Sequence, residues 1–316
     1  MKLPTLYKKT TIGKTQTWEI EVSGNKFRTI SGQADGKKIT NNWTVCQGKN
    51  VGKKNATTGE EQALKEAEAK HKKKLEAGYH LNLKNISKKR FYEPMLAQDF
   101  KNKNRQSEVM ADLQQVDGGT VGTVFSQPKL DGIRCIAMRE GLFTRTGKEI
   151  VAVPHIHEAL EPFFEKYPNA VLDGELYNHA YKDDFNKIIH LVRKQNLTEE
   201  HLKESEEMIQ YWVYDAPVIG NATVGDKCWT EKDLFSDRTS VLDAQFANLG
   251  LLTLEERGET QSIVIVETTE IHGREQLDRC YEDYIEAGYE GQMVRLDGPY
   301  ENKRSPKLLK RKEFVD

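Results

Sequence analysis

One lysine at a predicted strand-loop-strand junction constrains this chain more than any other feature. Lys129 lies in the run Gln127-Pro128-Lys129-Leu130-Asp131-Gly132-Ile133-Arg134, whose core reads Lys-x-Asp-Gly-x-Arg. The apolar pair Val124-Phe125 predicts the end of one strand, and Asp131-Gly132 predicts a turn. The alternating residues 133–137 predict a second strand. The pattern therefore places a lysine where a strand meets a loop.

A lysine in such a place has two interpretations. It becomes a nucleophile when desolvation or a nearby positive charge favours loss of its proton. Arg134 supplies such a charge, and its guanidinium also suits a phosphate or ribose oxygen. Because the pattern is short, an ordinary solvated Lys-Leu-Asp-Gly turn is an equally good interpretation of these residues alone.

The same run resembles motif I of the covalent nucleotidyltransferases, which include ATP-dependent DNA ligases, RNA ligases and mRNA capping enzymes. The resemblance implies that Lys129 attacks the α-phosphate of a nucleoside triphosphate and forms a lysyl-nucleotide phosphoramidate. Gln127 then lies beside the base. Its amide both donates and accepts hydrogen bonds, which suits the N6 edge of adenine.

The length and the cysteines exclude several protein classes. With 316 residues the chain is long enough for two domains. It has no apolar run of about 18 residues, and its N-terminus lacks the apolar segment of a signal peptide. The four cysteines are far apart without a Cys-x-x-Cys, so we expect neither a disulfide framework nor a zinc site. These features predict an intracellular protein, in the cytoplasm or nucleus, with no membrane partner. We expect it to be a monomer.

Charge is distributed unevenly along the chain. Residues 1–90 hold 20 Lys+Arg against 8 Asp+Glu, a balance of +12, and the remaining residues carry −14. A small domain with this charge is typical of a partner for a polyanion, most simply nucleic acid. The alternative is a lysine-rich surface that only keeps the protein in solution.

The basic N-terminal residues predict a small sheet followed by one helix. Residues 15–50 read as an antiparallel sheet, with turns at 23–26 and 34–37 and a strand from Ile39 to Val45. Thr58-Gly59-Glu60-Glu61 is a capping-box signature, which predicts a helix from Glu60 to about Ala77.

This arrangement resembles a WGR domain over roughly residues 5–80. The resemblance rests on the strands around Trp18 and Phe27, on the turns Ser31-Gly32 and Asp35-Gly36, and on the lysine-rich helix. The Trp-Gly-Arg tripeptide itself is absent. The resemblance implies a DNA-binding domain over residues 1–80, followed by a linker over residues 81–90.

Residues 91–316 mix strand-like and helix-like runs in irregular order, which predicts an α+β fold. Pro94-Met95-Leu96-Ala97 is similar to the start of a ligase catalytic domain. The resemblance therefore implies an ATP-grasp-like adenylation domain, built of antiparallel sheets flanked by helices.

Three further runs match ligase motifs in order. Arg145 lies before a turn and is implied to hold a phosphate of the nucleotide or of the DNA 5′ end. Glu175 ends the apolar run Val171-Leu172-Asp173-Gly174-Glu175 and is implied to bind the ribose or a metal ion. Tyr214, before an aspartate, is the candidate to stack on adenine, although Trp212 lies on the same strand face. Without the family resemblance, Arg145 suits an ordinary hairpin arginine, Glu175 suits a polar strand end, and Tyr214 suits a strand of the core.

The last two motifs lie near the end of the chain. Glu290, in Glu-Gly-Gln-Met, is implied to coordinate Mg²⁺. Lys310 and Lys312 alternate with Leu309 and Arg311, so both lie on one side of a predicted strand and suit one phosphate. Without the family resemblance, Glu290 is an ordinary glutamate at a turn, and Lys310 and Lys312 belong to a solvated basic tail.

The ordered set predicts an ATP-dependent DNA ligase. Its implied cofactors are ATP and Mg²⁺, and its implied partner is nicked duplex DNA in repair, replication or recombination. An mRNA capping guanylyltransferase or an RNA ligase is the alternative within the family, and a non-catalytic nucleic-acid-binding protein is the alternative outside it. Ligases generally continue into an OB-fold domain, which carries a last motif that orients pyrophosphate, and no such domain is evident in this sequence. We therefore expect the chain to bind ATP but to adenylate itself and seal nicks poorly.

Overall fold

The computed structural model describes residues 1–10, 13–86, 91–116, 119–220, 229–240, 242–250 and 262–312. Residues 87–90 of the predicted linker and Cys228, one of the four cysteines, lie outside these ranges. The chain divides into two compact units, Met1–Phe91 and Tyr92–Asp316. Each unit is described by itself.

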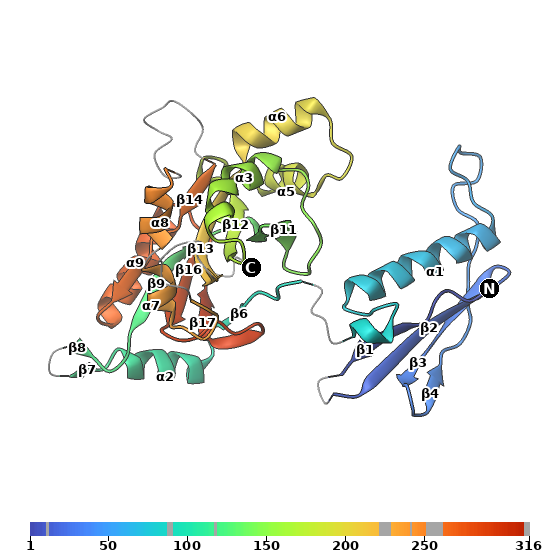
Figure 1. Cartoon of the computed structure of the whole chain (residues 1–316), viewed down its shortest axis with the longest axis horizontal. Helices are drawn as coiled ribbons and strands as arrows, with labels where there is room; N and C mark the ends of the chain where they lie inside the picture. The colour runs from blue at the N-terminus through green and yellow to red at the C-terminus, as the bar shows by residue number, and fades with distance from the viewer. Residues whose placement is uncertain are drawn as a thin grey trace. The chain divides into compact units, whose positions relative to one another are not determined.

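The first unit is a twisted sheet covered by one helix (Figure 1). Its strands are β1 (Leu6–Lys9), β2 (Thr15–Ser23), β3 (Lys26–Gln33), β4 (Lys38–Thr40) and β5 (Thr44–Val45). The helix α1 (Gly59–Glu76) is followed by the short helix η1 (Leu83–Asn85). The expected single strand from Ile39 to Val45 is wrong in extent, since it forms two short pieces whose residues are exposed.

The capping box predicted for α1 is confirmed. The Thr58 hydroxyl accepts from the Glu61 backbone N–H, and the Glu61 carboxylate accepts from the Thr58 N–H. This satisfies donors that the first helical turn leaves unpaired. The helix packs Ala63 and Ala67 on the apolar face of the sheet, where Trp18 and Phe27 are buried.

The second unit contains two five-stranded sheets with helices. One sheet has the order β11-β10-β12-β13-β14, and the other has the order β15-β9-β16-β17-β6. The first consists of β10 (Ile133–Met138), β11 (Gly141–Thr144), β12 (Val171–Tyr177), β13 (Gln210–Val218) and β14 (Ile263–Ile265). The second consists of β6 (Leu96–Asp99), β9 (Val124–Lys129), β15 (Thr269–Ile271), β16 (Gly291–Leu296) and β17 (Arg304–Arg311). A small hairpin adds β7 (Gln115–Val116) and β8 (Gly119–Thr120).

Helices cover the outer faces of both sheets. Against the β10–β12–β13 sheet pack α3 (Pro154–Ala159), α4 (Glu161–Lys166), α5 (Phe185–Arg193) and α8 (Leu242–Asn248), with α3 and α5 visible beside β12 in Figure 1. Against the β9–β16–β17 sheet pack α2 (Lys103–Asp112) and α9 (Arg274–Glu286). The remaining helices are η2 (His179–Tyr181), α6 (Glu199–Met208) and α7 (Phe235–Thr239).

This architecture confirms the α+β prediction. Most neighbouring strands are antiparallel, and the pairs β13–β14 and β17–β6 are parallel. In the described part of the chain no helix is long and apolar enough to cross a membrane.

Candidate active site

A cavity of about 830 Å³ is lined by strands of both sheets in the second unit. Among the described residues that line it, nine are cationic and one, Glu175, is acidic. The cations are Lys129, Arg134, Arg145, Lys148, Arg193, Arg295, Arg304, Lys310 and Lys312. This balance favours a polyanionic ligand.

Strand alternation explains which side chains reach the cavity. Successive residues of a strand face opposite sides. In β16, Val294 and Leu296 enter the hydrophobic core while Met293 and Arg295 line the cavity. In β17, Leu309 is in the core and Lys310 is in the cavity. The predicted separation of Lys310 from Leu309 is confirmed.

Lys129 closes β9 and forms an ion pair with Glu290. Its Nζ donates to Glu290 Oε2, and Lys312 Nζ donates to Oε1 of the same carboxylate at 2.8 Å. Burial alone would raise the pKa of Glu290, but the bonds from the two lysines outweigh it and leave that pKa lowered. The bond to Glu290 raises the pKa of Lys312. One carboxylate thus holds two ammonium groups at the cavity.

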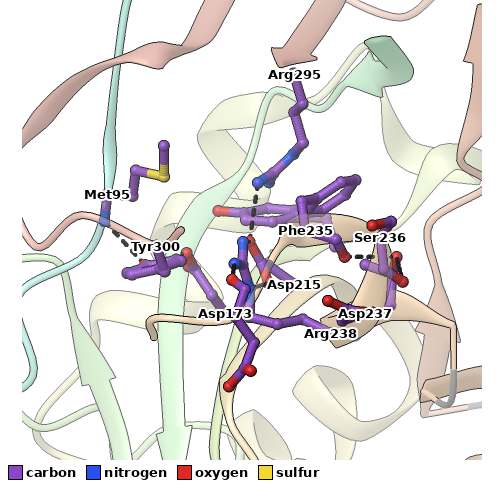
Figure 2. Close-up of polar contacts among 12 residues, drawn as sticks. Met95, Asp173, Asp215, Phe235, Ser236, Asp237, Arg238, Arg295 and Tyr300 are labelled. Carbon is purple, nitrogen blue, oxygen red and sulfur yellow. Dashed lines mark hydrogen bonds and ion pairs between the residues drawn. The ribbon is translucent and has the colours of Figure 1, made fainter. Parts of the chain in front are cut away.

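Arg134 is held by a second carboxylate. Its Nε and Nη2 donate to Asp173 Oδ1 and Oδ2 at 2.9 and 2.5 Å. Tyr300 also donates its hydroxyl to Asp173 Oδ2, at 2.6 Å, and accepts from the Met95 backbone N–H at 2.8 Å (Figure 2). Burial would lower the pKa of Arg134, but Asp173 outweighs it and raises that pKa.

Glu175 lies two residues after Asp173 in β12, so both side chains project from the same strand face. Burial is the largest influence and raises the pKa of Glu175 to about 8, against the opposing charges of Arg134 and Lys129. The Tyr214 hydroxyl donates to its Oε2 at 3.5 Å. Burial thus favours the protonated form of this carboxyl, which can donate to a ligand oxygen.

Tyr214 lines the cavity between two guanidinium groups. The Cζ atoms of Arg134 and Arg295 each lie 5.6 Å from its ring centroid. Trp212 packs edge-on against Tyr177, at 5.5 Å between ring centroids, and is not among the lining residues. Of the two aromatic candidates, the structure brings Tyr214 to the cavity.

The amide of Gln127 is engaged within the protein. Its Nε2 donates to the Tyr214 carbonyl at 3.1 Å and to Thr268 Oγ1 at 2.8 Å, and its Oε1 accepts from Arg295 at 2.8 Å. Gln127 is 1% exposed. Its role in reading adenine stays a prediction, and these contacts fix the orientation of the amide.

Arg145 and Lys310 also line the cavity. Within the described ranges, neither side chain forms a hydrogen bond or an ion pair, so both are available to a ligand. The structure thus brings all the predicted phosphate-binding cations to one cavity. Their individual roles stay predictions.

Sequence patterns did not show which partners the buried acids have. Asp215 accepts from Arg238 at 2.9 and 3.0 Å and from Arg295 at 2.9 Å (Figure 2). Burial would raise the pKa of Asp215, but the two arginines outweigh it and lower that pKa. Arg295 ends the Glu-Gly-Gln-Met-Val-Arg run, yet the run gives no sign of its partner because that partner lies in the other sheet.

The acids of the site do not form a cluster typical of a protein-only metal centre. Among the described residues, no group of three or more His, Cys, Asp or Glu stands close enough together to hold a metal ion. Mg²⁺ is usually bound through one or two carboxylates together with substrate phosphates. Glu290, whose pKa is lowered, fits that second arrangement, and Glu175 fits it once its proton has been displaced.

Comparison with known proteins gives a consistent result. Residues 94–312 match the family model described as "ATP dependent DNA ligase domain". The DNA ligase of African swine fever virus isolate Pig/Kenya/KEN-50/1950 is 27% identical over 292 residues, which cover 88% of this chain and 59% of the viral protein. The isolate Tick/South Africa/Pretoriuskop Pr4/1996 enzyme is 26% identical over the same length. The chain thus spans about three fifths of the curated relatives it matches.

A solved structure titled "Pmar-Lig_Pre." has a TM-score of 0.50 and 22% sequence identity, and the match covers 71% of this chain and 47% of that one. At this level of identity, the likeness concerns the fold of the chain and not its chemistry. It supports the two-sheet α+β architecture derived above.

Proposed function

The chain belongs to the ATP-dependent DNA ligase family, and on that premise we propose that it transfers AMP from ATP to Lys129 as the first step in sealing nicks in duplex DNA. The observation that carries this proposal is the position of Lys129. Its ammonium lies at a cavity with nine cationic lining side chains, which suits a triphosphate.

The proposed reaction has three steps. The deprotonated Nζ of Lys129 attacks the α-phosphorus, so that an N–P bond forms and the bond to pyrophosphate breaks. The nick's 5′-phosphate oxygen then takes the AMP from Lys129, which regains its free amine. The 3′-hydroxyl finally attacks that 5′-phosphorus, loses its proton and releases AMP. The protein mainly positions these groups and stabilises their charge.

The other cavity residues take roles that suit their surroundings. Lys310 and Lys312 hold the α-phosphate, and Arg145 holds a phosphate of the nucleotide or of the DNA 5′ end. Glu175 hydrogen-bonds the ribose. Tyr214 stacks on adenine, while Gln127 and Arg134 shape the walls around the nucleoside.

Mg²⁺ is the proposed metal, and Glu290 and Glu175 are its proposed ligands. When bound, it offsets the negative charge of the triphosphate. Glu290 is shared by Lys129 and Lys312, so a metal ion held by this carboxylate would leave both ammonium groups to the phosphates.

Nicked duplex DNA is the proposed partner. The first unit supports this proposal, because Lys65, Lys70, Lys72 and Lys73 are exposed along α1. A row of exposed lysines favours a phosphate backbone. Replacing these four lysines by glutamine in the full chain should weaken binding to nicked duplex and flatten its salt dependence. Unchanged binding would limit DNA contact to the second unit. We place the protein where DNA is, in the cytoplasm or nucleus, and propose that it acts as a monomer.

Family membership favours ATP over GTP and DNA over RNA, so the capping and RNA-ligase alternatives lose support. The test is intact mass after incubation with ATP and Mg²⁺, and separately with GTP. We expect a slow gain of one AMP on the wild type, in line with poor self-adenylation, and none on Lys129→Ala. A GMP adduct would assign the chain to the capping branch. If no adduct forms and no ATP binds, the non-catalytic alternative is correct.

A further inference from the structure

One arginine joins the two sheets beside the proposed adenine end of the cavity. Arg295 projects from β16 and is 4% exposed. Its Nη1 donates to Asp215 Oδ2 in β13 at 2.9 Å, and Figure 2 shows it reaching toward that carboxylate. Its Nε donates to Gln127 Oε1 at 2.8 Å. The same guanidinium therefore contacts a residue of each sheet.

The bond to Gln127 determines how the amide points. Because Gln127 Oε1 accepts from Arg295, its Nε2 faces β13 and donates to the Tyr214 carbonyl at 3.1 Å. Arg295 also lies 5.6 Å from the centroid of the Tyr214 ring. Tyr214 is thus held at its backbone through Gln127 and at its ring through the guanidinium.

Asp215 anchors this arrangement. Both of its oxygens accept from Arg238, which is 1% exposed, so the carboxylate cannot turn away from Arg295. Burial lowers the pKa of Arg295, against the opposing charge of Asp215. A buried guanidinium requires its partners, because an unpaired charge in the interior is costly.

We propose that Arg295 is a positioning residue for nucleotide binding, which fixes Gln127 and Tyr214 around the base without contacting the phosphates. This inference rests on the proposed function, since it needs the nucleotide in this cavity. Lysine at this position keeps the charge, but its single ammonium cannot reproduce the planar fork that reaches both Gln127 and Asp215.

The inference separates base binding from phosphate binding. If Arg295 acts on the base end, Arg295→Lys weakens ATP binding while inorganic tripolyphosphate still meets the other cations of the cavity. A general loss of structure would weaken both ligands together. The matched control is Arg311→Lys in β17. Arg311 pairs with Asp278 at 2.7 Å, lies 4.1 Å from the Tyr281 ring, and is not among the cavity's lining residues.

Equilibrium titration of the full chain with ATP and with tripolyphosphate tests the proposal. We expect Arg295→Lys to weaken ATP about tenfold, the range of one hydrogen bond to a charged group, and to change tripolyphosphate less than about twofold. Arg311→Lys should change neither by more than about twofold. An unchanged ATP affinity in Arg295→Lys, or an equal loss for both ligands, would overturn the inference.

A second variant covers the case in which Arg295→Lys does not fold. Gln127→Leu keeps the Arg295–Asp215 pair and removes the amide, and we expect the same selective loss of ATP binding. Equal losses of ATP affinity and tripolyphosphate affinity in Gln127→Leu would also refute the inference. Failure of the wild type to bind ATP would instead refute the proposed function.

Discussion

Lys129 and Arg134 lie in different sheets although only residues 130–133 separate them. Lys129 ends β9, and Arg134 is the second residue of β10. Both side chains nevertheless line the same cavity. The Lys-x-Asp-Gly-x-Arg run is therefore the point where the chain crosses from one wall of the site to the other.

Lys312→Ala should slow formation of the AMP adduct by at least about tenfold, because it removes one charge-assisted interaction with the phosphate. The measurement is the rate of mass gain with ATP and Mg²⁺. Lys303→Ala is the control, since Lys303 pairs with Glu301 at 2.8 Å, is 68% exposed and does not line the cavity. Equal rates for the two variants would remove Lys312 from the site.

Glu175→Gln should become more stable relative to the wild type as pH rises. Burial raises the pKa of Glu175 to about 8 in the folded protein, whereas an unfolded glutamate titrates near pH ~4.3. The folded state thus retains a proton that the unfolded state loses. Wild-type stability falls between these two pH values, by at most about 1.4 kcal/mol per pH unit, and levels above them. Glutamine has no such dependence.

Denaturant unfolding of both proteins at about pH 5, 7 and 9, which run from just above ~4.3 to just above ~8, measures this difference. The free energy of unfolding of Glu175→Gln should exceed that of the wild type by more at the second pH than at the first. This difference should stop growing once the Glu175 carboxyl has ionised in the folded protein. A gap that does not vary with pH would show that Glu175 titrates normally in the folded protein.

Arg238→Met should lower the free energy of unfolding by about 3–5 kcal/mol, because it leaves Asp215 buried with one partner fewer. Arg238 and Asp215 are 1% and 0% exposed. Lys187→Met, which removes a half-exposed ion pair with Glu204, should cost less than about 1 kcal/mol. If chemical denaturation shows similar losses of unfolding free energy for the two variants, the buried Asp215 carboxylate does not need Arg238 as a partner.

Gly132→Ala should destabilise the second unit by about 1–3 kcal/mol. A Cβ at this position would lie 2.4 Å from the Leu176 carbonyl oxygen and 2.9 Å from Glu175 Cγ, so β12 must shift. Gly298→Ala is the control, since its nearest contact is an ordinary 3.5 Å from Lys307. Thermal unfolding compares the two variants. Equal midpoint temperatures would show that the loop between β9 and β10 tolerates a side chain at Gly132.

Local patterns predicted the parts of the site that depend on one strand at a time. The alternation around Lys310 and the strand-loop-strand unit at Lys129 follow from a period of two residues and from turn chemistry. The capping box at Thr58 follows from a fixed spacing of three residues. Each of these features is complete within about ten residues of sequence.

The contacts between sheets were not predictable in this way. Asp215 and Arg295 are 80 residues apart, and Asp173 and Tyr300 are 127 apart. Nothing in either local sequence specifies which buried carboxylate meets which cation, because that depends on how the two sheets face each other. For the same reason the sequence did not indicate that the Gln127 amide contacts Arg295 and the Tyr214 carbonyl, and its role in reading adenine stays a prediction.

The link between Lys129 and Glu290 has a consequence for timing. Glu290 N donates to the Lys129 carbonyl at 3.0 Å, and Gly291 pairs with Lys129 across the strands, so the two backbones are fixed to each other. The ammonium and the carboxylate can separate by rotation within either of the two side chains. Release of the amine is thus a side-chain rotamer change, and no strand has to move before chemistry begins.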